Sequence, residues 1–282
     1  MTNTAYDKLN SMVEKIISKI ESGETGSWFK PWIGAGLPTN FASKTMYNGF
    51  NILSLLYTTE ENEYKTNYWL TFNQLKKLGG KLNKGSVATP VFFFKPIEVN
   101  EENDEGETIK KTIPLLKFYN VFNLDQTNLE LGNIENSLDL SFEEFISNTN
   151  VSIKQAGKAF YSPSNDYIGM PHISLFDSVD SYKSVLLHEL AHSTGHENRL
   201  NRDLSGTFGS ESYAKEELIA ELSSMFLSSH LGIKSKIRHE AYLENWLQAI
   251  KAEPKLLWKS ASEAQKVFDY LLGLQQTQQK AA

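Results

Sequence analysis

The sequence contains no cysteine among its 282 residues, which excludes disulfides, thiolate metal ligands, cysteine nucleophiles and iron–sulfur clusters. It also lacks any apolar run of about 18 residues, so no transmembrane helix is expected. The segment Met1–Asp7 has no basic stretch followed by an apolar one, so no secretory signal is expected. These absences favour a cytoplasmic protein with no membrane partner.

Arginine is absent from residues 1–130, which hold 14 lysines and 15 acidic residues. The net charge of −6 argues against a nucleic-acid partner only until the distribution of charge is considered. Between Tyr64 and Ile97 there are six lysines and neither Asp nor Glu. Acidic residues gather just beyond, from Glu101 to Glu107, in a segment typical of a solvated loop.

The spacing of apolar residues predicts an α+β fold in two domains. The first half is predicted to begin with a helix over Leu9–Ile20 and an ordered loop over 24–51. A second helix is predicted over Phe72–Leu78, capped by Thr71, and strands over Val91–Lys95 and Leu115–Asn123 are predicted to form a long hairpin. The second half is predicted to contain strands over Ala159–Tyr161 and Tyr167–Phe176. Four helices are predicted to follow: from Asp180 or Ser181 to about Thr194, from Glu211 to about Leu231, around Glu240–Ile250, and over Ser260–Leu274. We expect a first domain over 1–130, a linker over 131–142 and a second domain over 143–282.

The strongest motif is His188-Glu189-Leu190-Ala191-His192. Residues four apart lie on one face of a helix, so His188 and His192 can present two imidazoles to one metal ion. Zinc accepts neutral imidazole and carboxylate ligands and keeps one position open in catalytic sites. Glu189 lies beside the two imidazoles and can act as a general base toward water at the metal.

A third ligand is expected from the next predicted helix, where Glu217 and Glu221 are four residues apart. The pattern resembles gluzincins such as thermolysin, which implies Glu217 as ligand and Glu221 as a carboxylate that supports a ligand histidine. Glu216 is expected to face solvent. His196 is a weaker candidate, because one helix rarely supplies three ligands to a tetrahedral ion.

Two further features of the second half bear on a peptide substrate. The predicted strand Tyr167–Phe176 could be the edge along which an extended peptide pairs. Tyr161 and Tyr167 flank it, and either could polarise a scissile carbonyl, although tyrosines near strands more often serve packing.

The lysine-rich segment also carries aromatic residues, a combination that could bind single-stranded DNA, although aromatic residues in strands more often belong to a core and lysines to a solvated surface. Lysines pair with phosphates, and aromatic rings stack on unpaired bases without reading their sequence. Trp28 and Trp32 lie in the aperiodic loop and are the better stacking candidates, whereas Trp69 could equally belong to the core. The expected DNA contacts are Trp28, Trp32, Trp69, Lys76, Lys77, Lys81 and Lys84.

Taken together, both halves resemble one family, the ArdC antirestriction proteins of conjugative plasmids and related mobile elements. In the first half the resemblance runs through Trp28–Trp32, Pro38-Thr-Asn40, Tyr47-Asn-Gly-Phe-Asn51, Trp69-Leu-Thr-Phe-Asn-Gln74, Leu78-Gly-Gly-Lys81, Lys84-Gly85 and Tyr119-Asn-Val-Phe-Asn-Leu-Asp-Gln126. In the second half it runs through Tyr161-Ser-Pro163, Met170-Pro171, the histidine motif, Thr194-Gly-His196, Arg199-Leu-Asn-Arg202, Phe208-Gly209, Tyr213 and Glu216-Glu-Leu-Ile-Ala-Glu221. The resemblance implies a single-stranded-DNA-binding domain followed by a zincin-like metallopeptidase domain.

Three functions remain open from the sequence. The chain could bind single-stranded DNA and act as a zinc peptidase on proteins nearby. It could instead be a DNA-binding shield whose zincin domain holds a structural metal, or a peptidase whose first domain recognises protein. Glu189 favours an enzyme, since a purely structural metal site needs no base beside its ligands.

Overall fold

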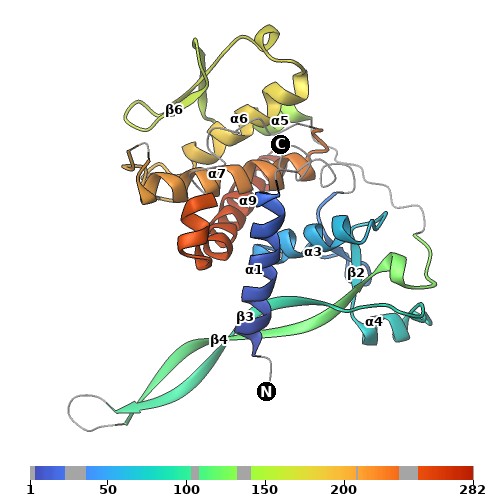
Figure 1. Cartoon of the computed structure of the whole chain (residues 1–282). Helices are drawn as coiled ribbons and strands as arrows, with labels where there is room; N and C mark the ends of the chain where they lie inside the picture. Colours follow the sequence, from blue (N-terminus) through green and yellow to red (C-terminus); the bar gives the residue numbers. More distant parts are fainter. Residues whose placement is uncertain are drawn as a thin grey trace.

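The computed structural model describes residues 4–22, 36–102, 108–131, 141–207, 209–234 and 247–281. It confirms an α+β fold, in which the metal-site helices lie at one end and a long β-hairpin projects from the other (Figure 1). No helix of these described segments is long and apolar enough to cross a membrane. The predicted linker falls mostly on residues 132–140, which lie outside the described residues.

The first helix, α1 (Ala5–Glu21), begins where the sequence supplies a capping box. Thr4 accepts a hydrogen bond from the backbone N–H of Asp7, and the Asp7 carboxylate accepts one from the backbone N–H of Thr4. The predicted apolar stripe is its buried face and consists of Leu9, Met12, Val13, Ile16, Ile17 and Ile20. This face packs on the central hairpin and on the next helix.

The first sheet has four strands in the order β1-β2-β4-β3: β1 (Thr39–Asn40), β2 (Tyr68–Leu70), β3 (Thr89–Glu102) and β4 (Thr108–Asn123). The hairpin of β3 and β4 is longer than the predicted strands, because its outer pairs continue beyond the core to the acidic segment. There Glu98 pairs with Lys110 and Glu101 with Lys111 across the two strands.

Two helices stand beside this sheet, and one of them was not predicted. Helix α3 (Phe50–Glu61) is buried on most of its surface, so it lacks the amphipathic spacing that would reveal it. Helix α4 (Phe72–Lys77) has the predicted Thr71 cap, completed by Gln74. A 3-10 turn, η2 (Leu124–Gln126), follows β4.

The second sheet has three strands in the order β5-β7-β6: β5 (Ser152–Gln155), β6 (Phe160–Ser162) and β7 (Tyr167–Met170). The expectation that Tyr167–Phe176 forms a peptide-binding edge is wrong, because β7 pairs with a strand on each side. The strand also ends at Met170, and the 3-10 turn η3 (Ile173–Leu175) follows.

The helices that the structure defines in full in the second half are α5 (Phe142–Ser147), α6 (Val179–Ser193), α7 (Glu211–His230) and α9 (Lys255–Ala281). Helices α6 and α7 agree closely with their predictions, whereas α9 extends well beyond Ser260–Leu274 at both ends. Of the predicted helix around Glu240–Ile250, residues 240–246 lie outside the described part of the chain, and residues 247–250 are helical.

The hydrophobic core is continuous between the two halves. Helix α9 packs on α7 and also on α3. The ring centroids of Phe94 in β3 and Trp258 in α9 lie 5.8 Å apart, and the backbone N–H of Gly49 donates to the Gln265 side chain at 2.9 Å. The last helix therefore packs against both halves. The expected boundary near residue 131 divides the sequence motifs into two groups, but the main hydrophobic core contains residues from both sides of it.

Candidate metal centre

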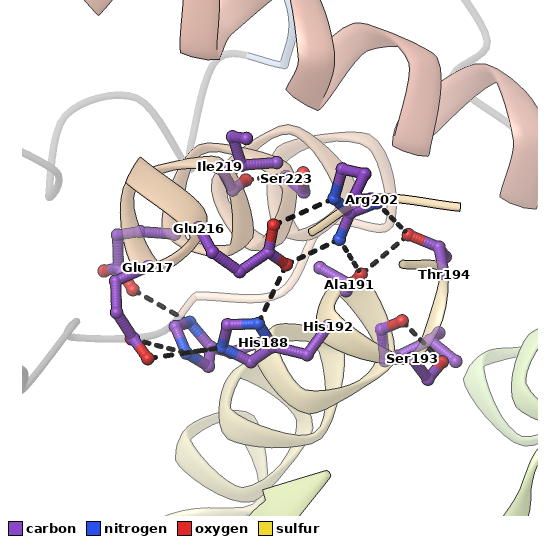
Figure 2. Close-up of polar contacts among 12 residues, drawn as sticks. His188, Ala191, His192, Ser193, Thr194, Arg202, Glu216, Glu217, Ile219 and Ser223 are labelled. Carbon is purple, nitrogen blue, oxygen red and sulfur yellow. Dashed lines mark hydrogen bonds and ion pairs between the residues drawn. The ribbon is translucent and has the colours of Figure 1, made fainter. Parts of the chain in front are cut away.

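Two neighbouring helices bring the three predicted ligands together. His188 and His192 lie one turn apart on α6, and Glu217 reaches them from α7 (Figure 2). The Nε2 atoms of the two histidines are 3.1 Å apart, and the Glu217 carboxylate oxygens lie 3.4 Å and 3.6 Å from them. One ligand atom from each residue lies within 4.8 Å of the other two. This donor set, two imidazoles and a carboxylate, is one that could hold a divalent metal ion.

Each histidine is held by a second carboxylate on α7. His188 Nδ1 donates to Glu221 at 3.1 Å, as expected, and His192 Nδ1 donates to Glu216 at 3.1 Å. With the proton on Nδ1, each Nε2 keeps its lone pair for a metal. The prediction that Glu216 faces solvent is wrong: this residue is only 8% exposed and lies between the two helices.

Glu216 is also bound to a buried arginine that the sequence analysis missed. Arg202 donates to the two Glu216 oxygens at 2.7 and 3.0 Å, to the Thr194 hydroxyl at 2.7 Å and to the Ala191 carbonyl at 2.8 Å (Figure 2). Arg202 thus joins the end of α6 to α7 and balances the charge of Glu216. A signal for it existed, because arginine occurs only three times in the sequence and two copies follow the histidine motif directly.

The electrostatics of the site favour cations. Burial lowers the pKa of His188, but the hydrogen bonds that its imidazole donates to Glu217 and Glu221 outweigh it and raise that pKa well above the usual value. Burial raises the pKa of Glu217, yet the contacts with His188, His192 and Tyr213 lower it to about 2. Glu217 is therefore ionised at neutral pH, and the site attracts a proton or a metal ion.

Glu189 faces the same open cleft as the two histidines. The cleft has a volume of about 460 Å³ and is walled by α6, by the start of α7 and by residues on and beside strand β6. Strand β6, unlike β7, is an edge of its sheet. Phe160 of β6 lines the cleft and packs over Gly169, where even a Cβ atom would come within 2.4 Å of its ring.

The two tyrosines proposed to polarise a carbonyl have structural partners. The Tyr161 hydroxyl donates to Asp166 at 2.8 Å and accepts from Arg199 at 3.1 Å. Burial, followed by the contact with Asp166, raises the pKa of Tyr161 to about 12, so its proton stays on this hydrogen bond. Tyr167 packs edge-on against Phe160, with Lys154 over its ring.

The predicted DNA contacts fall into three groups. Lys76, Lys77, Lys81 and Lys84 are all exposed, on α4 and in the segment that follows it. Trp69 is a correction: it is 0% exposed in a small core with Tyr47, Leu55, Val91 and Val121, so its ring cannot stack on a base. Trp28 and Trp32 lie outside the described residues.

Two family models match successive parts of the chain. Residues 6–122 match the N-terminal domain of the anti-restriction factor ArdC, and residues 141–263 match a zincin-like metallopeptidase. The two matches follow one another along the chain, an ArdC-type N-terminal domain and then a zincin-like domain. The chain belongs to the ArdC antirestriction family.

Relatives of similar length support this membership. The metal-free crystal structure of antirestriction protein ArdC from plasmid R388 has 35% identity and a TM-score of 0.79, covering 95% of this chain and 97% of that one. The Mn(II)-bound structure of the same protein gives 35% identity and a TM-score of 0.76, with coverage of 94% and 96%. The uncharacterized protein y4eC of Sinorhizobium fredii is 31% identical over 98% of this chain and 95% of its own length.

Longer relatives contain the same unit. A DNA primase TraC of Escherichia coli is 34% identical over 95% of this chain, and a second TraC is 33% identical over 95%. This chain spans only 20% and 27% of the length of those two proteins.

Proposed function

We propose that this chain is an antirestriction protein of a mobile element that binds single-stranded DNA and carries a zinc peptidase centre. The observation that carries the enzymatic part is the convergence of His188, His192 and Glu217 at a cleft that Glu189 also faces. Zinc suits two neutral imidazoles and one carboxylate. When bound, such an ion polarises a carbonyl and lowers the pKa of a nearby water.

The chain's own groups supply the remaining chemistry. Glu189, at 9% exposed, is positioned to take a proton in the cleft and to return it to the leaving amine. The free edge of β6 offers backbone groups to an extended peptide beside it. Glu216 and Glu221 hold the imidazoles with Nε2 turned toward the metal position.

The openness of the site favours an enzyme over a structural metal. A structural zinc is normally closed by four protein ligands, whereas this site offers three ligands and a cleft. The runner-up function is a DNA-binding shield in which the zincin domain only supports the fold. A peptidase without DNA binding is the third, and the exposed lysines Lys76, Lys77, Lys81 and Lys84 disfavour it.

One set of measurements on the full chain tests the proposal. Purified protein is analysed for bound metal, incubated with a broad peptide library, and titrated with single-stranded and duplex oligonucleotides. We expect about one divalent ion per chain, metal-dependent cleavage, and tighter binding of single strands than of duplex. Absence of cleavage with the metal in place would favour the shield, and equal binding of both DNA forms would remove the single-strand assignment.

A further inference from the structure

One face of the β3–β4 hairpin is uncovered close to the body of the protein. Side chains alternate between the two faces of a strand, so residues two apart share a face. The pairing register sets Phe93 opposite Lys117 and Lys95 opposite Leu115, with Tyr119 two residues from Lys117 on the same face. Phe93, Lys95, Leu115, Lys117 and Tyr119 are all exposed.

The aromatic residues on this face are exposed although the opposite face of the same strands reaches the core. Phe93 and Tyr119 are each 42% exposed, and their rings lie 6.0 Å apart at an interplanar angle of 55°. On the opposite face of the same strands, Phe92 and Leu116 are buried in the main core. Two neighbouring aromatic rings left open to solvent form a surface on which flat apolar groups can stack.

Close to the two rings, the charged side chains of this face are all lysines. Neither Lys95 nor Lys117 forms an ion pair with a described carboxylate, and strand β4 contains no acidic residue. Glu98 points to the other face, where it pairs with Lys110, and on this face the first carboxylate is Glu101, paired with Lys111. The lysines beside the rings therefore remain available for phosphates.

We propose that Phe93 and Tyr119, flanked by Lys95 and Lys117, form the stacking platform for single-stranded DNA. This inference rests on the proposed DNA binding and gives it a location on the sheet in addition to the lysines of α4. Bases in a duplex are already stacked on one another, so rings of this kind bind unpaired bases, and the lysines follow the backbone without reading sequence. An extended protein segment is the competing occupant, but a lysine-rich face without free acids fits a polyanion better.

The test uses the full chain and a short oligothymidine, with binding measured by fluorescence anisotropy. Replacing both rings (F93A with Y119A) removes stacking on two bases, and we expect a loss of affinity of roughly 5- to 150-fold for each base that no longer stacks. Reversing both lysines (K95E with K117E) should also weaken binding and lower the magnitude of the salt slope by about 1.4, at about 0.7 per phosphate.

The matched control changes an aromatic and a lysine that are equally exposed on α1, in the variants Y6A and K15E. These changes should leave affinity within about twofold of the unchanged protein. Circular dichroism and metal content should stay the same in every variant, since all the replaced side chains are on the surface. A ring variant that loses its fold is replaced by F93S with Y119S, which keeps small side chains on the strands.

The outcomes separate the location from the function. If the unchanged chain binds oligothymidine and the ring variant binds it equally well, the platform is refuted and DNA binding elsewhere stands. If the unchanged chain does not bind single strands at low salt, the proposed function itself fails. If the ring variant instead changes the molecular mass measured by light scattering and leaves DNA affinity intact, the face is a contact between copies and the platform is refuted.

Discussion

The metal centre and the hairpin face differ in how their functional groups are held. At the metal centre every ligand is buried or nearly so, and each imidazole is fixed by a carboxylate, one of which is bound to a buried arginine. On the hairpin face the rings of Phe93 and Tyr119 are exposed, as are Lys95 and Lys117, and these two lysines form no ion pair with a described carboxylate. A reaction needs groups fixed in position before the substrate arrives, whereas binding a strand of any sequence needs groups that can adjust.

The largest effect, on peptide cleavage, should come from replacing Glu189, the residue proposed to take the proton. Replacing Glu189 with Gln keeps the shape of the cleft but removes the base, so we expect cleavage to fall by about 10²- to 10⁴-fold. Metal content, measured on the same preparation by atomic emission, should remain about one ion per chain. His192→Ala is the contrasting variant, because it should lose the metal as well. Unchanged cleavage by the Glu189 variant would remove this residue from the mechanism.

The next effect concerns the exposed lysines. Changing Lys76, Lys77, Lys81 and Lys84 together to Glu removes up to four phosphate contacts. At 0.1 M salt this should weaken single-strand binding by roughly 600-fold, at about 0.7 per contact in the log–log slope. Peptide cleavage should not change, because helix α4 lies well apart from α6 and α7 in the fold (Figure 1). Loss of both activities would show that the two regions are not separate in function.

A smaller effect, on metal affinity, should follow from replacing Glu216, the carboxylate that holds the His192 imidazole. Glu216→Gln keeps a partner for His192 but loses the charge that Arg202 balances, and we expect metal affinity to fall by about 10- to 100-fold. Competition with a chromogenic chelator measures this directly. Arg202→Ala should be worse for stability, since it leaves the Glu216 carboxylate buried without its cation. Equal metal affinity in the unchanged protein and the Glu216 variant would assign this pair to fold stability alone.

The smallest expected effect is the pH dependence of metal binding. The pKa of His188 without a metal is raised above its ordinary value of 6.5. A proton on His188 therefore begins to compete with the metal at a pH above 6.5, and it competes more strongly as the pH falls. Affinity should therefore fall as pH falls, by up to about tenfold per pH unit for each proton displaced. Calorimetry in buffers of different ionisation enthalpy would count these protons. Binding that strengthens toward acid pH would contradict this sign.

The two regions also differ in how far the sequence predicted them. The histidine pair depends on spacing within one helix, which the sequence shows directly. Whether Glu216 or Glu217 faces α6 depends on how two helices pack, and in fact both carboxylates reach the histidines. Trp69 has the aromatic character of a stacking residue, but strand pairing places it in a core. Phe93 and Tyr119 are adjacent only through the hairpin register, which the predicted strands left open.

The position of β7 has the same kind of explanation. Its sequence predicts a strand, but its place between β5 and β6 depends on a parallel pairing with β5, which was not predicted. Helix α3 was missed because it is apolar on most sides, as expected for a helix enclosed by a sheet and other helices. Local spacing therefore predicted the elements that carry the metal ligands better than the contacts between elements.

The shared packing of α9 has a consequence for how the molecule comes apart. Heating cannot expose the α9 surface that covers α3 without also disturbing the surface that covers α7, because one helix supplies both. The link includes the Gly49 hydrogen bond to Gln265 and the contact of Phe94 with Trp258. Both halves should therefore melt in one cooperative transition, and a protease cut near residue 135 would leave two fragments that remain associated until that transition.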